Sequence, residues 1–298
     1  MRYGFIGLGN LGAKLAGSLL RAGLDLTVND LSRENAASLL ALGAKWADSP
    51  EALAREVDVV ITCLPSPSIS ERVLAGVLKG AKPGAIWLEM STNDSDTIKR
   101  LAALAAEKGV ETLECPVTGG VHLAASGDIT VIVGGDAALY ERCRQALQAM
   151  GKQIFNVGPI GSASVIKVIT NMLAFIHLVA AGEALMLAKR GGLDLAQAFQ
   201  VIKASSGNSF VHETESQLVL NGSYNINFTM DLACKDLGFA MQFGREFGVP
   251  LDLAALTSQT FVRARSAYGG DAWSTQVVKL LEDALKTDLR APGFPSQL

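Results

Sequence analysis

The residues of this chain that are most distinctive chemically are three glycines near its start, Gly7, Gly9 and Gly12. They form a Gly-x-Gly-x-x-Gly motif that follows a short apolar run and opens a helical pattern, which is the context in which this motif binds a dinucleotide. The first glycine permits a tight turn, the second lets the backbone approach a pyrophosphate, and the third lets helix and strand pack closely. The helix N-terminus adds amide donors. We therefore predict a dinucleotide-binding loop made of Gly7, Leu8, Gly9, Asn10, Leu11 and Gly12.

Asp30 lies 23 positions after Gly7 (30 minus 7), close to the spacing of about 20 residues at which an acid contacts the adenosine ribose of NAD. A carboxylate accepts hydrogen bonds from the ribose hydroxyls and repels a 2′-phosphate, so Asp30 favours NAD over NADP. Arg33 lies nearby and could accommodate that phosphate in part, so NADP stays as the less favoured cofactor. The alternatives are that the glycine loop is a turn without a ligand and that Asp30 is an acid of a surface turn.

Lys167 and Asn171 lie four residues apart in a helical pattern and therefore share one helix face. The two residues on either side of Lys167 are apolar, which disfavours the alternative of an ordinary solvated lysine. An amine beside an amide suits a hydroxyl group, because the amine can take the hydroxyl proton while hydride leaves the same carbon for a nicotinamide. An amine with the usual pKa of about 10.4 is a poor base at neutral pH, so burial or a neighbouring cation must lower the pKa of Lys167.

The elements that must position these residues change character near the middle of the chain. Short β-rich runs alternate with helical patterns in the first half, which predicts an α/β fold with a parallel, doubly wound sheet. The predicted strands are Tyr3 to Ile6, Asp25 to Asn29, Val57 to Leu64, Ala85 to Glu89, Glu111 to Glu114 and Ile129 to Val133. Beyond about Gly161 the patterns are helical, beginning with a helix capped by Ser162 that reaches about Arg190. We predict a dinucleotide-binding domain over 1–160 and an all-helical domain over 161–298.

Composition excludes several classes of protein. The 298 residues carry a formal net charge of -3 without a basic cluster, so no nucleic-acid partner is expected. Four dispersed cysteines and three histidines indicate neither a metal site nor a disulfide framework. The first residues run straight into the glycine motif, which predicts a cytoplasmic protein. The apolar run from Asn171 to Ala188 contains polar residues and is expected to be a buried helix, with no membrane partner. The tail after about Leu289 is expected to be poorly ordered.

Several short motifs occur in an order that is more specific than any one of them. They are GFIGLGNLG, Cys63-Leu64-Pro65, Met90-Ser91-Thr92, Pro116-Val117-Thr118-Gly119-Gly120, Gly161 with Lys167 and Asn171, and Lys235-Asp236-Leu237. Over essentially its whole length the chain resembles the 3-hydroxyisobutyrate dehydrogenase family, the β-hydroxyacid dehydrogenases. The resemblance implies a Rossmann domain followed by a helical domain, and the reversible oxidation of a 3-hydroxy acid by NAD(P).

The resemblance also implies roles for single residues. Lys167 would be the general acid/base and Asn171 the second catalytic residue. Lys235 would lie near the nicotinamide, where a second cation would lower the pKa of Lys167 and attract an anionic substrate. The family usually has serine where this chain has Thr118, an added methyl group that could change the shape of the substrate site.

Two loops complete the predicted site. The backbone amides of Thr118, Gly119 and Gly120, with the Thr118 hydroxyl, could hold a substrate carboxylate, and the alternative is a loop without a ligand. Thr92, Leu64 and Pro65 follow predicted parallel strands, whose carboxyl ends form the edge at which doubly wound sheets bind ligands. We expect those three residues to contact the cofactor.

Three functions fit these residues. The first is a dehydrogenase of a small carboxylic acid such as 3-hydroxyisobutyrate, D-glycerate, serine or threonate. The others are a reductase of another carbonyl or an imine, and a catalytically silent NAD-binding scaffold. Because Lys167, Asn171 and Lys235 occur together, the dehydrogenase is favoured. The strongly apolar second half also predicts a homodimer or homotetramer.

Overall fold

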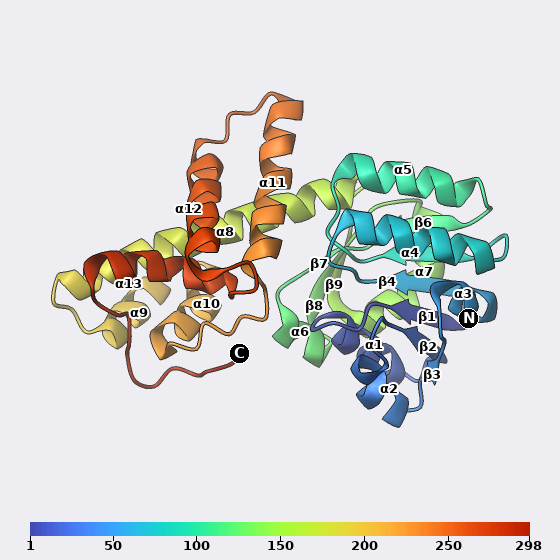
Figure 1. The fold of residues 1–298 in the computed structure, drawn as a ribbon, viewed down its shortest axis with the longest axis horizontal. Coiled ribbons are helices and arrows are strands. Elements are labelled where there is room, and N and C mark those ends of the chain that lie inside the picture. Colours follow the sequence, from blue (N-terminus) through green and yellow to red (C-terminus); the bar gives the residue numbers. More distant parts are fainter. The chain divides into compact units, whose positions relative to one another are not determined.

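A computed structural model describes all residues, 1–298. The chain divides into two compact units, Met1–Lys167 and Val168–Leu298, and Figure 1 shows strands and helices alternating in the first and helices alone in the second. The predicted fold class, a Rossmann-type α/β domain followed by a helical domain, is confirmed.

The first unit is built on a parallel sheet of six strands in the order β3-β2-β1-β4-β5-β6. Its strands are β1 (Tyr3–Ile6), β2 (Leu26–Asn29), β3 (Lys45–Trp46), β4 (Val59–Thr62), β5 (Ile86–Glu89) and β6 (Glu111–Glu114). All residues of β1, β2, β4 and β5 are buried, as expected of apolar strands that are covered on both faces. The order reverses between β1 and β4, which places the glycine loop after β1 at the switch point of the sheet.

Helices cover both faces of this sheet (Figure 1). The helices of the first unit are α1 (Gly12–Arg21), α2 (Ala37–Ala41), α3 (Pro50–Glu56), α4 (Pro67–Gly80), α5 (Ser95–Ala106), α6 (Val121–Ser126) and α7 (Ala137–Met150), with the 3-10 turn η1 (Arg33–Ala36). Phe5 of β1 packs in one core with Leu15 of α1, whereas Val60 of β4 packs in another with Leu53 of α3. Alternate strand residues therefore serve opposite faces of the sheet.

A second, three-stranded sheet lies in the same unit, with the order β7-β8-β9. Its strands are β7 (Val117–Thr118), β8 (Ile129–Val133) and β9 (Gly151–Asn156). β8 pairs antiparallel with β7 and parallel with β9, so its expected place in one parallel sheet was wrong. No local pattern indicated β3, β7 or β9, because the first two have two residues each and β9 is mostly polar.

The second unit contains helices and one 3-10 turn. These are most of α8 (Ser162–Arg190), then α9 (Leu195–Lys203), α10 (Phe210–Asn221), α11 (Met230–Phe247), α12 (Asp252–Tyr268), η2 (Ser274–Val278) and α13 (Lys279–Leu285). The predicted end of the long helix at Arg190 is confirmed. Phe175 of α8 meets Phe261 of α12 edge to face, with ring centroids 5.2 Å apart, at the centre of this unit's core.

α8 is less buried than its sequence predicted. By length and composition it passes as a candidate membrane span, with a mean hydropathy of 1.8, and 28% of its most apolar window is buried. The expectation of a buried helix is therefore wrong for the single chain. Leu173 and Leu187 are among its exposed apolar side chains, at 44% and 76% exposure.

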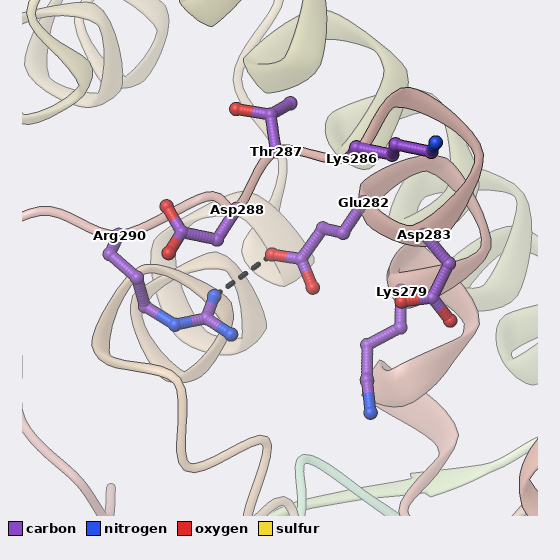
Figure 2. A pocket seen from close by; sticks show the side chains of 7 residues that line it. All are labelled: Lys279, Glu282, Asp283, Lys286, Thr287, Asp288 and Arg290. Atoms are coloured by element: carbon purple, nitrogen blue, oxygen red, sulfur yellow. Dashed lines mark hydrogen bonds and ion pairs between the residues drawn. The ribbon is translucent and has the colours of Figure 1, made fainter.

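The C-terminal segment is held against the second unit, so the expected disordered tail was wrong. The buried Glu282 carboxylate accepts the Leu289 backbone amide at 2.8 Å and an Arg290 guanidinium N–H at 2.9 Å, and Figure 2 shows the Glu282–Arg290 pair. Further along, Asn221 donates to the Phe294 carbonyl at 2.9 Å. Proline and glycine in this segment prevent a helix, but side chains from elsewhere in the unit fix its path.

Candidate active site

The glycine loop after β1 has the shape that its sequence predicted. Gly7 has a φ of 96°, and a Cβ there would lie 2.3 Å from the Cys63 carbonyl oxygen. A Cβ on Gly12 would lie 1.9 Å from the Gly7 oxygen, whereas one on Gly9 would meet nothing within 4 Å. The first and last glycines are therefore required by the turn itself, and the middle one leaves open space over the backbone. This arrangement fits a dinucleotide pyrophosphate at the start of α1.

Asp30 comes directly after β2 and is joined to that loop. One of its carboxylate oxygens accepts the Leu8 backbone amide at 2.6 Å. The other accepts the Ser32 amide at 3.0 Å and the Asn35 side-chain amide at 2.9 Å. These bonds orient the carboxylate beside the glycine loop. An acid that accepts hydrogen bonds from the adenosine ribose is expected at this place.

The ends of β4 and β5 are tied together by a buried carboxylate that sequence reasoning did not consider. Glu89, at 1% exposure, accepts the Thr62 hydroxyl at 2.6 Å and the Ser91 amide at 2.7 Å. Thr62 in turn accepts the Trp87 indole N–H at 2.8 Å. Burial raises the pKa of Glu89, which its hydrogen bonds lower in part. Glu89 ends the otherwise apolar strand β5, and this position of a charged residue was the one local sign of the network.

This network places two of the predicted cofactor contacts. The Ser91 hydroxyl accepts the Leu64 backbone amide at 2.7 Å, which fixes the turn that carries Leu64 and Pro65. Thr92 follows Ser91 and is half-buried. All three predicted residues therefore lie at the carboxyl edge of the sheet, where doubly wound folds bind ligands.

The predicted carboxylate-binding loop lies at the end of β7. Gly119 and Gly120 both have positive φ, 122° and 93°, so neither position suits an L side chain. Thr118 is half-buried and pairs with Thr130 of β8. His122, the second residue of α6, is also half-buried, and burial lowers its pKa. Both glycines therefore belong to the loop geometry, and a ligand of this loop stays a prediction.

The start of α8 is capped by Glu114, for which the sequence suggested no partner. One Glu114 oxygen accepts the amides of Gly161 at 2.5 Å and Ala163 at 2.9 Å. The other accepts both the amide and the hydroxyl of Ser164, at 3.0 Å and 2.6 Å. Ser162 is therefore the first helical residue and not the cap that was expected, because a carboxylate from β6 supplies the acceptor. Burial raises the pKa of Glu114, and these four bonds oppose that shift.

Lys167 lies one turn beyond this cap and is 7% exposed, in agreement with its apolar neighbours. Asn171 follows four residues later on the same helix. The first unit thus brings together the glycine loop, Asp30, the β4 and β5 ends and the capped start of the helix that carries Lys167.

In the second unit Asp236 joins two of the predicted residues. Its buried carboxylate accepts the Asn171 amide at 2.6 Å and the Lys235 ammonium at 2.6 Å. The charge of Lys235 is therefore balanced by Asp236, and its ammonium also lies 4.9 Å from the centre of the Phe239 ring. Asp236 was part of a recognised motif, but no site role was assigned to it. Leu237 and Ala233, which is one turn earlier on α11, are both buried, so this face of the helix points inward.

A charged hollow of about 690 Å³ also lies in the second unit (Figure 2). Its lining residues are Lys279, Glu282, Asp283, Lys286, Thr287, Asp288 and Arg290. None of the predicted site residues lines it. Glu282 and Arg290 are paired there to hold the C-terminal segment, so this hollow has a structural explanation.

Comparison with known proteins agrees with this geometry. Residues 2–158 match the family described as the NAD binding domain of 6-phosphogluconate dehydrogenase, and residues 161–281 match that described as NAD-binding of NADP-dependent 3-hydroxyisobutyrate dehydrogenase. A 2-(hydroxymethyl)glutarate dehydrogenase of Eubacterium barkeri is 33% identical over 95% of each chain. An NAD-dependent L-serine dehydrogenase of Pseudomonas aeruginosa is 35% identical over 80% of this chain and 83% of that protein.

Among solved structures, a 3-hydroxyisobutyrate dehydrogenase from Salmonella typhimurium is 32% identical and superposes with a TM-score of 0.88, over 94% of this chain and 99% of the other. Fold, glycine cradle and relatives together define an NAD(P)-binding oxidoreductase that acts on CH–OH groups. The chain belongs to the 3-hydroxyisobutyrate dehydrogenase family of β-hydroxyacid dehydrogenases, as its motifs predicted.

Proposed function

We propose that this chain oxidises the hydroxyl-bearing carbon of a small 3-hydroxy acid with NAD as the hydride acceptor, and that Lys167 is the general acid/base. The observation that carries the proposal is a buried amine, 7% exposed, on a helix whose start is fixed by Glu114 and whose next turn presents Asn171. A proton-transfer group must be held in a defined position, and this helix holds Lys167 in that way.

The bound dinucleotide supplies the hydride acceptor at its nicotinamide ring. The Nζ atom of Lys167 accepts the substrate hydroxyl proton during oxidation and returns it during reduction. The Asn171 amide orients the same hydroxyl, and its own orientation is set by the bond to Asp236. The amides of Gly119 and Gly120, with the Thr118 hydroxyl, hold the substrate carboxylate. Lys235, paired with Asp236, adds a donor for an anionic substrate.

Asp30 supports NAD as the cofactor, because its carboxylate is oriented beside the glycine loop and would repel a 2′-phosphate. The matched families and relatives include both NADP-dependent and NAD-dependent dehydrogenases, so the preference rests on Asp30. Relatives named for 2-(hydroxymethyl)glutarate and L-serine support a small carboxylic acid as the substrate.

We also propose that the chain forms a homodimer or homotetramer through its helical unit. The support is that only 28% of the most apolar window of α8 is buried within the single chain, because an exposed apolar surface of this kind marks an interaction site. Sedimentation equilibrium at micromolar concentration tests this, and a monomer would contradict it.

The function is tested by the initial rate of NAD reduction with 3-hydroxyisobutyrate, L-serine, D-glycerate, L-threonate and 2-(hydroxymethyl)glutarate. Turnover of one of these acids with NAD supports the proposal. Binding of NADH without turnover of any of them would instead favour a silent scaffold or a reductase of another bond.

A further inference from the structure

Arg33 is the charged residue nearest in sequence to the predicted ribose site, and it makes no ion pair with Asp30. It begins η1, three residues after Asp30. Its guanidinium carbon lies 5.6 Å from the centre of the Trp46 ring, which is a cation–π distance. Arg33 is therefore held by an aromatic face although a carboxylate lies close to it in the chain.

Trp46 is itself fixed beside the end of β2. In the sheet it pairs with Val28, and its indole N–H donates to Asp48 at 2.7 Å. The next residue, Ala47, is bonded to β2 twice, through its amide to the Val28 carbonyl at 3.0 Å and through its carbonyl from the Asn29 side chain at 2.8 Å. The aromatic ring thus has a defined place one strand away from Asp30.

The two cofactors differ only in the 2′-phosphate of the adenosine ribose. That group carries negative charge, so Asp30 repels it and a free Arg33 guanidinium would attract it. Pairing with the phosphate would cost this contact if the guanidinium has to leave the Trp46 ring to reach it. At exposed sites a cation–π contact corresponds to about a two- to fivefold change in an equilibrium.

We propose that Trp46 determines cofactor specificity together with Asp30, by holding Arg33 on its ring and so withholding a cation from the 2′-phosphate. Trp46 acts through Arg33, so it is a positioning residue. The inference rests on the proposed use of a dinucleotide and extends it to a residue outside the glycine motif.

The test is direct binding of NADH and NADPH, measured by calorimetry without substrate. Trp46→Leu should raise the affinity for NADPH about two- to fivefold and leave the affinity for NADH unchanged. Trp46→Phe, which keeps an aromatic face, is the matched control and should resemble the native protein. In an Arg33→Leu background the Trp46→Leu change should have no effect. Asp30→Ser brings weak NADPH binding into the measurable range, and the same ratios should hold there.

Trp46 lies on a two-residue edge strand, so Trp46→Thr, which suits a strand, repeats the test if the leucine variant unfolds early. If the ratio of NADPH affinity to NADH affinity is unchanged in the folded variants, the role of Trp46 is overturned and the proposed function is not affected. A loss of NADPH affinity also overturns it, because the ring would then be presenting Arg33 to the phosphate. If the native protein binds neither dinucleotide, the proposed function fails and the inference fails with it.

Discussion

Glu114 at the end of β6 accepts two hydrogen bonds from Ser164, one from its backbone amide at 3.0 Å and one from its hydroxyl at 2.6 Å. Fifty residues separate the two in the chain. The bond attaches the helix that carries Lys167 to the sheet that carries the glycine loop. Gly134 makes room for this contact, because a Cβ there would lie 2.3 Å from a Glu114 oxygen.

Replacing this carboxylate should destabilise the fold. Glu114→Gln turns an acceptor of buried N–H groups into an amide that points a donor at them, and we expect a loss of about 2–4 kcal/mol in the free energy of unfolding. Urea unfolding followed by circular dichroism measures it. Glu107→Gln, on an exposed residue, is the control. Equal urea midpoints for native protein and Glu114→Gln would show that the cap contributes little.

Asn93 is 1% exposed, and neither its side-chain oxygen nor its nitrogen has a hydrogen-bond partner. A buried polar group without a partner lowers stability. Asn93→Leu, of similar size, should therefore raise the free energy of unfolding by about 1–2 kcal/mol, whereas Asn93→Asp should lower it. Thermal melting of the three proteins decides the matter, and a destabilised leucine variant would mean that a bound water satisfies the amide.

Glu215 on α10 makes no hydrogen bond or ion pair, and burial raises its pKa to about 8. The folded protein then holds a proton that the unfolded chain, with a pKa of about 4.3, has released, so the free energy of unfolding should fall as pH rises from about 4.3 to 8.

Glu215→Gln removes this dependence. From pH 5.5 to 8.5 the native protein should lose roughly 3 kcal/mol relative to the variant. Exposed Glu56→Gln serves as the comparison. If the free energy of unfolding has the same pH dependence in the native protein and in Glu215→Gln, the raised pKa of Glu215 is contradicted.

Because the space over Gly9 is open, a side chain at this position can affect dinucleotide binding without affecting the fold. Gly9→Ala meets nothing within 4 Å of its new methyl group, so stability should stay within about 0.5 kcal/mol of native. The methyl group would nevertheless occupy the approach of the pyrophosphate, so NADH affinity should fall at least about tenfold. Gly238→Ala, equally unobstructed, should leave NADH affinity intact. Native affinity in Gly9→Ala would place the dinucleotide elsewhere.

Sequence patterns predicted the features that depend on neighbouring residues. The strand β1 and the glycine motif after it are local, and so is the helix from Ser162 to Arg190, with its four-residue spacing of Lys167 and Asn171. The bounds of β6 and β8 were predicted as they occur for the same reason.

Features that join distant segments could not be predicted. The Glu114 cap and the Asn171–Asp236 bond each span tens of residues, and no local pattern specifies which amide a carboxylate will meet. The C-terminal segment has a sequence typical of a disordered terminus, yet hydrogen bonds with Glu282 and Asn221 fix its position. The exposed side of α8 was also missed. An apolar composition predicts that a helix is buried, but it does not specify whether this chain or another one covers it.

We propose that the Lys167 Nζ atom carries the hydroxyl proton, and the rate of Lys167→Ala tests this role most directly. With the best acid of the panel and saturating NAD, kcat should fall at least about a hundredfold, NADH affinity should be retained, and added methylamine should restore part of the rate. Exposed Lys108→Ala should behave as native. Native kcat in Lys167→Ala would show that another group moves the proton.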